Sequence, residues 1–197
     1  VPNALGTTER TKRTNQRGDR MLPLRMHSRV RSLSSVATVR FMILHTLRLR
    51  SFRAHRESEI SLAPSINLLH GPNGVGKTNV LEALHYLCLT KSFVASRDRY
   101  AVRTEAPYFE IEGTVAGVRE EPITVRLAYV PGEGKSIFVN GAELDRLADI
   151  VGLLPVVVFS PQDHALTADG PEERRRFVNN ILSQARPVYM DDLMKYR

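Results

Sequence analysis

The sequence predicts an α/β fold, because a strand, a glycine-rich turn and a helix follow one another directly between residues 65 and 89. Residues 65–70 form a short apolar run, which is typical of a buried strand. Residues 78–89 carry apolar side chains at helical spacing, so an amphipathic helix is expected there. This order directs the amides of the turn and the helix N-terminus at one point, where negative charge is favoured.

The turn itself is the most informative segment of the chain. Residues 71–78 read Gly-Pro-Asn-Gly-Val-Gly-Lys-Thr and fit the P-loop pattern G-x-x-x-x-G-K-[ST]. Its glycines let the backbone approach phosphate oxygens closely, Lys77 supplies a charge for the β- and γ-phosphates, and the Thr78 hydroxyl suits Mg²⁺. We therefore expect ATP at Gly71, Pro72, Asn73, Gly74, Val75, Gly76, Lys77 and Thr78, with Thr78 as a Mg²⁺ ligand.

Length and composition narrow the class of protein. The 197 residues suit about one domain, and an apolar content of 42% supports a core. A single cysteine, Cys88, allows no internal disulfide and suits a reducing cytosol, so a cytoplasmic location is expected. Residues 150–159 form the longest apolar stretch, which is too short to span a bilayer, so no membrane association is expected. The six histidines show no metal-ligand spacing.

The net charge of +7 comes entirely from residues 1–41, which hold nine of the 28 basic residues and two of the 21 acidic ones. This extension lacks sustained periodicity, so we expect it to be disordered. Three interpretations compete for it: a basic arm that binds nucleic acid, an organellar transit peptide, or upstream sequence translated from a wrongly chosen start. The third is favoured, because strand-like patterning begins only at Met42.

From Met42 onward the pattern is regular. Apolar and polar residues alternate in several short runs that predict strands, Asn140-Gly141 predicts a turn, and Gly170-Pro171 predicts the start of a helix. Besides the strand, loop and helix already described, the predicted elements are strands at 42–50, 57–62, 109–115, 123–130 and 136–139, a basic loop or short helix at 91–103, a helix at 142–151, a fully buried strand at 155–159, a helix from 170 through 182 and a last helix from about Val188.

Two longer stretches, residues 47–53 and 67–83, resemble the N-terminus of ABC-type ATPases of DNA repair and chromosome structure. Within that class the chain resembles the bacterial RecF family. More selective matches are residues 90–93 after the predicted helix, residues 159–163, and the C-terminal motifs Gly170-Pro171, 174–177, 182–184 and Tyr189. The resemblance covers everything from Met42 to Arg197.

The resemblance implies the head of an ABC-type ATPase. Residues 42–160 would form its ATP-binding lobe I, with a mixed sheet and an antiparallel β subdomain, and residues 161–197 the start of a helical lobe II. It also implies ATP and DNA binding, dimerisation on ATP, and recombinase loading at single-stranded or gapped DNA with RecO and RecR, in DNA repair, replication and SOS induction. The signature and Walker B motifs of the family lie further downstream, and the run 156–159 ends in Ser160 rather than Asp. We therefore expect the front part of a longer protein, with negligible ATP hydrolysis by this chain.

The resemblance also marks residues outside the P-loop. Arg53 follows the first strand, where related ATPases place a basic residue near the nucleotide; a solvated loop arginine is the alternative. Gln162 stands where RecF sequences usually carry Glu, and is a candidate for sensing Mg²⁺ or the attacking water, or it only ends a strand. The candidate DNA contacts are Lys91, Arg97, Arg99 and Arg103, although the nearby acids Asp98 and Glu105 equally fit a solvated mixed-charge surface.

Other functional classes stay open. The chain could belong to another SMC-like ABC ATPase, or to a P-loop kinase of small molecules, although residues 108–139 do not look like the lid such a kinase needs. An inactive interaction fragment is a further alternative. The consecutive Arg174, Arg175 and Arg176 cannot share one helix face, because successive helical residues point about 100° apart, so a helix surface is favoured over a patch.

Overall fold

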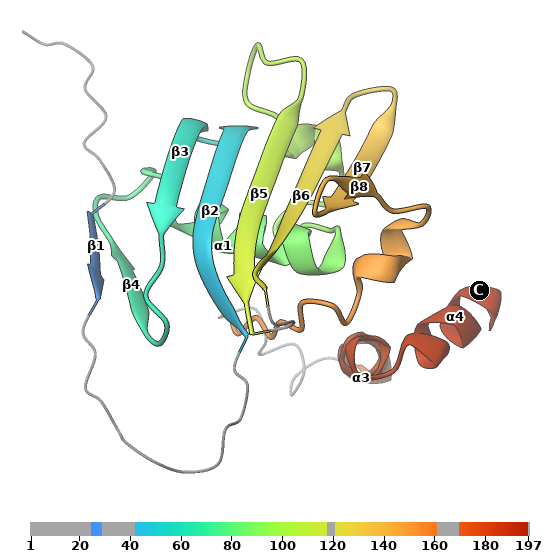
Figure 1. Cartoon of the computed structure of the whole chain (residues 1–197). Helices are drawn as coiled ribbons and strands as arrows, with labels where there is room; N and C mark the ends of the chain where they lie inside the picture. Colours follow the sequence, from blue (N-terminus) through green and yellow to red (C-terminus); the bar gives the residue numbers. More distant parts are fainter. Residues whose placement is uncertain (1–24, 29–41, 118–120, 161–169, 197) are drawn as a thin grey trace, which may run out of the picture.

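The computed structural model describes residues 25–28, 42–117, 121–160 and 170–196, and shows an antiparallel sheet packed on a central helix (Figure 1). Together with the sequence motif, this arrangement confirms the α/β P-loop class. The strands are β1 Arg25–Ser28, β2 Ile43–Phe52, β3 His55–Ser61, β4 Asn67–His70, β5 Phe109–Ala116, β6 Ile123–Val130, β7 Gly134–Val139 and β8 Ala142–Glu143. The helices are α1 Lys77–Leu89, α3 Pro171–Ala185 and α4 Pro187–Tyr196, with 3₁₀ turns η1 Asp98–Ala101 and η2 Leu147–Ile150.

The main sheet has six strands in the order β3-β2-β5-β6-β7-β8, and every described pair in it is antiparallel. The strands expected from alternation over residues 42–62 and 109–139 are confirmed, with ends shifted by a few residues. Strand β5 shows the cause most clearly, since its residues alternate between buried and half-buried along its whole length. Such a period of two places one face on the core and the other toward solvent.

Helix α1 covers the inner face of this sheet (Figure 1). Its buried residues include Val80, Ala83, Tyr86 and Leu87. The rings of Phe52, Tyr86 and Phe109 meet edge to face, with centroids 5.2 to 5.8 Å apart. Because these three rings come from β2, α1 and β5, they fix the helix against the sheet. The core of the protein therefore lies between α1 and the six-stranded sheet.

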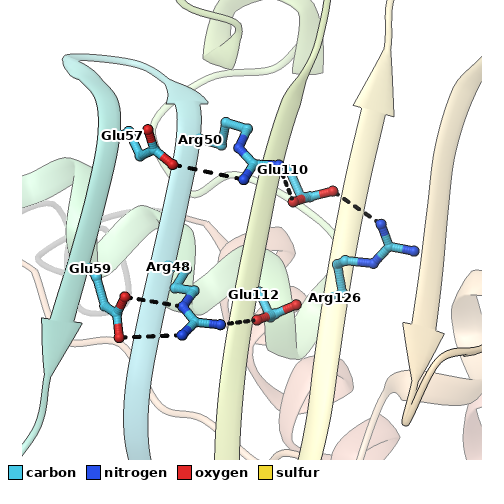
Figure 2. A network of polar contacts seen from close by, with 7 residues as sticks. All are labelled: Arg48, Arg50, Glu57, Glu59, Glu110, Glu112 and Arg126. Carbon is cyan, nitrogen blue, oxygen red and sulfur yellow. Dashed lines mark hydrogen bonds and ion pairs between the residues drawn. The ribbon is translucent and has the colours of Figure 1, made fainter.

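The outer face of the same sheet carries a network of ion pairs instead of an apolar layer (Figure 2). Each arginine on this face lies opposite a glutamate of a neighbouring strand, so the charges compensate one another across β3, β2, β5 and β6. Exposed pairs of this kind add little stability individually, but they keep the face polar. The pairs are Arg48 with Glu59 and Glu112, Arg50 with Glu57 and Glu110, and Arg126 with Glu110.

The strand before the P-loop departs from the sequence prediction. The expectation of a buried strand at 65–70 is wrong in its burial, because β4 alternates between half-buried and exposed residues, and Leu68 is 61% exposed. The reason is its neighbourhood: β4 belongs to a separate two-stranded sheet with β1, not to the six-stranded sheet. An apolar run becomes a buried strand only when other elements cover it, and the sequence of the run does not contain them.

The partner of β4 comes from the basic extension. Residues 25–28 form β1, which pairs antiparallel with β4 in a register that sets Arg25 opposite His70. The expectation of disorder throughout residues 1–41 is therefore wrong for these four residues, because β4 presents an open edge of amide and carbonyl groups that another strand can satisfy. The rest of the extension lies outside the described residues.

Two predictions in the C-terminal third are also wrong. Instead of one helix at 142–151, the chain forms β8, which pairs with β7 after the expected turn, and then the 3₁₀ turn η2. Residues 155–159 form no strand, and Phe159 is 93% exposed. The backbone of Val156 is satisfied by a side chain instead, because the Gln184 carboxamide accepts from its N–H at 2.7 Å and donates to its C=O at 3.1 Å.

The last two predicted helices are confirmed as α3 and α4. Pro171 stands in the first turn of α3, as expected, and Arg176 of this helix pairs with Glu173 at 3.2 Å. Within the described ranges, no helix combines the length and the apolarity needed to cross a bilayer.

Candidate nucleotide-binding site

The P-loop joins β4 to α1, as the sequence predicts. Gly71, Gly74 and Gly76 have φ values of 147°, 83° and 96°, which L side chains rarely adopt, so the loop can curve only with glycine at these positions. Helix α1 begins directly at Lys77, and no side chain caps its N-terminus. Its first turn carries no acidic residue. The free amide groups and the helix dipole therefore favour an anion at this end.

A buried histidine supports the loop from behind. His55, at the start of β3, is only 6% exposed, and its Nε2 lies 3.2 Å from the carbonyl oxygen of Gly76. A carbonyl can only accept, so Nε2 carries the proton and Nδ1 accepts from the Ser58 hydroxyl at 3.0 Å. Spacing along the chain does not predict this contact, because His55 and Gly76 are 21 positions apart. The structure shows a residue that fixes the last glycine of the P-loop.

The P-loop and the first turn of α1 supply one ammonium group, of Lys77, and one exposed hydroxyl group, of Thr78. Lys77 Nζ donates to the carbonyl oxygens of Gly71 and Pro72, at 2.9 and 2.8 Å, so the ammonium lies over the loop. Thr78 is exposed at the first turn of α1. These residues fit a triphosphate with Mg²⁺: the amides and Lys77 would hold phosphate oxygens, and the Thr78 hydroxyl would bind the metal.

Arg53 lies in the turn between β2 and β3 and points at the P-loop helix. Its guanidinium makes a two-point contact with the carboxylate of Glu82 in α1: Nε donates to Oε2 at 3.0 Å, and NH2 donates to Oε1 at 2.7 Å. A third donor reaches the Tyr100 carbonyl oxygen at 2.7 Å. Arg53 has φ 52°, in the left-handed region that is uncommon for residues other than glycine. The arginine is therefore an ordered part of the fold rather than a solvated loop residue.

The carboxylate of Glu82 is completely buried and also accepts a hydrogen bond from the Ser92 hydroxyl. The Ser92 oxygen in turn accepts from the backbone N–H groups of Val94 and Ala95, at 2.9 and 2.8 Å. A buried charge is tolerated only when it is paired, and this network provides the pairing. Glu82 therefore joins the P-loop helix to the residues that follow it.

A second network connects α1 to Asp98, further along the segment that follows this helix. Asp98 accepts from the Tyr86 hydroxyl at 2.9 Å and pairs with Lys135 of β7 at 2.8 Å. Lys135 also donates to the carbonyl oxygen of Thr90, the C-cap of α1. Burial raises the pKa of the Tyr86 hydroxyl far above its ordinary value, so this hydroxyl stays a donor.

The candidate DNA contacts all lie in this stretch, residues 91–103, which we call the basic segment. Lys91, Arg97 and Arg99 are exposed, and Arg99 stacks over the Tyr100 ring at 5.2 Å. Arg103 is half-buried and donates to the Ala54 carbonyl oxygen at 2.9 Å, so its contact is structural. The structure thus brings three exposed cations to one segment, which η1 interrupts. The remaining candidate, Gln162, lies outside the described residues.

Sequence reasoning assigned no role in the site to Glu82, Ser92 or Asp98, which connect α1 to the segment that follows it. A signal existed for Glu82, because it stands between Val80, Ala83 and Tyr86 on a helix whose apolar face is predicted to be buried. An acidic residue at such a position requires a cationic partner. Which cation supplies it depends on contacts between residues 29 positions apart, and spacing along the chain carries no information about them.

Comparison with known proteins agrees with this geometry. A family model described as an AAA domain matches residues 46–147, more than half of the chain. The protein named DNA replication and repair protein RecF of Salinibacter ruber is 85% identical over 156 residues, which cover 79% of this chain and 38% of that protein. The RecF of Chloroherpeton thalassium is 44% identical over 156 residues, covering 79% of this chain and 42% of that protein. The chain thus spans about two fifths of the length of these relatives.

Solved structures show the same similarity. A structure of the recombination mediator protein RecF-ATP in the RecFOR pathway superposes with a TM-score of 0.74 at 29% identity, over 79% of this chain and 42% of that one. A structure of an SMC ATPase superposes with a TM-score of 0.58 at 21% identity, over 71% of this chain and 99% of that one. The second likeness shows a shared fold.

Proposed function

Because the chain belongs to the AAA domain family and is RecF-like along 156 residues, we propose that it is an ATP- and DNA-binding protein of DNA repair and replication. The observation that carries the proposal is the P-loop, with its three left-handed glycines, its uncapped helix start and its lysine. ATP would bind with its phosphates over residues 71–78. Mg²⁺ at Thr78 would neutralise the charge of the β- and γ-phosphates.

The finer assignments follow from the resemblance. The relatives named DNA replication and repair protein RecF, and the solved RecF in the RecFOR pathway, support a role with RecO and RecR. Single-stranded or gapped duplex DNA as the substrate is part of the resemblance. In a protein with the full length of these relatives, ATP would drive dimerisation, and the dimer would load recombinase and take part in SOS induction in the cytoplasm. We assign residues 42–160 to the ATP-binding lobe and residues 161–197 to the start of the helical lobe. Gln162 stays a proposed sensor of Mg²⁺ or the attacking water.

The proposed DNA surface is the basic segment. Lys91, Arg97 and Arg99 are exposed cations on a loop tied to α1, and cations of this kind contact phosphates without reading sequence. Such binding weakens steeply with salt, because each phosphate contact releases a counterion.

Fluorescence anisotropy with a labelled gapped duplex, in the presence of ATP–Mg²⁺ and over a salt series, tests this assignment. Replacing Lys91 and Arg97 by alanine should weaken binding and make its salt dependence shallower. The matched control removes two cations on the opposite side of the sheet, Arg48→Ala with Arg50→Ala, and should leave both quantities nearly unchanged. Equal losses in the two proteins would place the DNA surface elsewhere.

A further inference from the structure

The buried carboxylate of Glu82 stands at the junction of the two proposed binding sites. It lies one helical turn after Thr78 in α1, so it moves with the residues that would hold the phosphates and the metal. Among the described residues, its hydrogen-bond donors are two Arg53 nitrogens and the Ser92 hydroxyl, and none is another residue of α1. The side chain is completely buried, so solvent does not compete for these bonds.

Through Ser92 and Arg53, Glu82 is connected to the basic segment at two places, near its beginning at residues 92–95 and near its end at residues 100–101. Ser92 holds its beginning, because the same hydroxyl that donates to Glu82 accepts from the amides of Val94 and Ala95. Arg53 holds its end, because the guanidinium that pairs with Glu82 also donates to the Tyr100 carbonyl oxygen. In addition, the backbone N–H of Arg53 donates to the Ala101 carbonyl oxygen at 2.8 Å.

The β2–β3 hairpin, whose turn carries Arg53, also contacts the P-loop. Two residues after Arg53, His55 contacts the carbonyl oxygen of Gly76, the residue before α1 begins. A displacement of the P-loop or of the first turn of α1 therefore changes the position of Glu82 and of the turn that carries Arg53. Packed networks of this kind transmit small shifts, since the interior is too dense to absorb them.

We propose that Glu82 is a positioning residue that transmits nucleotide binding at the P-loop to the basic segment. The inference rests on the proposed ATP site. Phosphate oxygens at the loop would compete with the Gly71 and Pro72 carbonyls for the Lys77 ammonium and would further restrain the first turn of α1. The restrained turn would limit the motion of Glu82, and Glu82 would limit the motion of the basic segment through Ser92 and Arg53. Binding that orders one site lowers the entropic cost of using the second, which links the two.

Hydrogen exchange of the full chain, with and without ATP–Mg²⁺, tests the inference. The readout is the exchange rate of the Tyr100 amide without nucleotide divided by its exchange rate with ATP–Mg²⁺. This amide donates to the Arg97 carbonyl oxygen and not to Ser92 or Glu82. In the wild type, ATP–Mg²⁺ should slow this exchange about fivefold or more, the lower end of typical coupling between sites. Glu82→Gln keeps the volume of the side chain, removes its charge, and should bring the ratio close to one.

Ser92→Ala provides a second variant, because it removes one of the two connections without disturbing the core, and should lower the ratio partway. Its matched control is Ser96→Ala, an exposed serine of the same segment, which should keep the wild-type ratio. A purely structural role for Glu82 and Ser92 would raise exchange equally with and without nucleotide and leave the ratio unchanged. That result, or a wild-type ratio of one in a chain that binds ATP by calorimetry, overturns the inference alone. A wild-type chain that binds no ATP overturns the proposed function as well.

Discussion

The Nε2 atom of His55 lies 2.6 Å from the point where a Cβ atom on Gly76 would stand. This distance is shorter than real Cβ contacts, so Gly76 has two reasons to be glycine: its φ of 96° and the imidazole behind it. Gly74 has a similar φ of 83°, but no atom lies within 4 Å of its Cβ position. A comparison of Gly74 with Gly76 therefore distinguishes the cost of a strained backbone from the cost of a steric conflict within one loop.

We expect Gly76→Ala to destabilise the protein more than Gly74→Ala. The second change costs only the left-handed backbone conformation, about 1 kcal/mol. The first adds the displacement of a buried histidine and its two hydrogen bonds. Thermal unfolding of both variants measures the difference. Adding His55→Ala should shrink the extra cost of Gly76→Ala, and equal costs in both backgrounds would contradict the steric explanation.

The two kinds of ion pair in this protein should respond differently to mutation. Glu82→Ala leaves Arg53 without its partner in a largely buried position, and breaking such a pair costs about 3–5 kcal/mol. Glu110→Ala removes a carboxylate that bridges Arg50 and Arg126 on the outer face (Figure 2), where solvent replaces the lost contacts. Chemical denaturation should therefore show a large loss for the first variant and a small fraction of it for the second. Comparable losses would mean that the outer network is cooperative.

His85 should make stability depend on pH. Burial lowers its pKa, although its bond to the Lys91 carbonyl oxygen and the nearby Glu82 carboxylate act in the opposite direction. The unfolded chain therefore takes up a proton at a higher pH than the folded chain, and stability falls as the pH drops below about 6.5. His85→Asn should lose less of its thermal midpoint between about pH 7 and about pH 5.5 than the wild type does. An unchanged pH dependence would contradict the assignment.

Removal of residues 1–41 deletes both the basic residues of the extension and strand β1, and two measurements distinguish their effects. The four residues of β1 form only a two-stranded sheet with β4, and such sheets are marginal by themselves, so the thermal midpoint should change little. Nonspecific DNA binding at low salt should fall markedly, because nine basic residues are lost. A midpoint several degrees lower would show that β1 supports the strand that leads into the P-loop.

The sequence predicted best what is encoded locally. The P-loop, helix α1 and the strands β2, β3, β5, β6 and β7 follow from short motifs and from periods of 2 and 3.6 residues, and these elements are confirmed. The sixth strand of the sheet, β8, was predicted as part of a helix. Alternation was sufficient for β5, because its core partner α1 and its neighbours β2 and β6 are all present in the chain.

The failures concern elements whose state depends on partners. Residues 155–159 and β4 are apolar enough to be buried strands, yet Phe159 and Leu68 are exposed because no described element covers them. A segment is buried only when another part of the protein covers it, and the sequence of the segment itself does not specify that covering element. The same limit hid the bond between Arg53 and Glu82, which depends on how a hairpin turn and a helix pack.

Isothermal titration of the chain with ATP–Mg²⁺, compared with Lys77→Ala, tests the central claim most directly. The wild type should bind one nucleotide per chain. Lys77→Ala should bind at least about tenfold more weakly, because a charge-assisted contact to phosphate is worth about 1.5–3 kcal/mol. The matched control Lys195→Ala removes an exposed lysine of α4, outside both proposed binding sites, and should keep the wild-type affinity. Equal affinities for the wild type and Lys77→Ala would contradict the account.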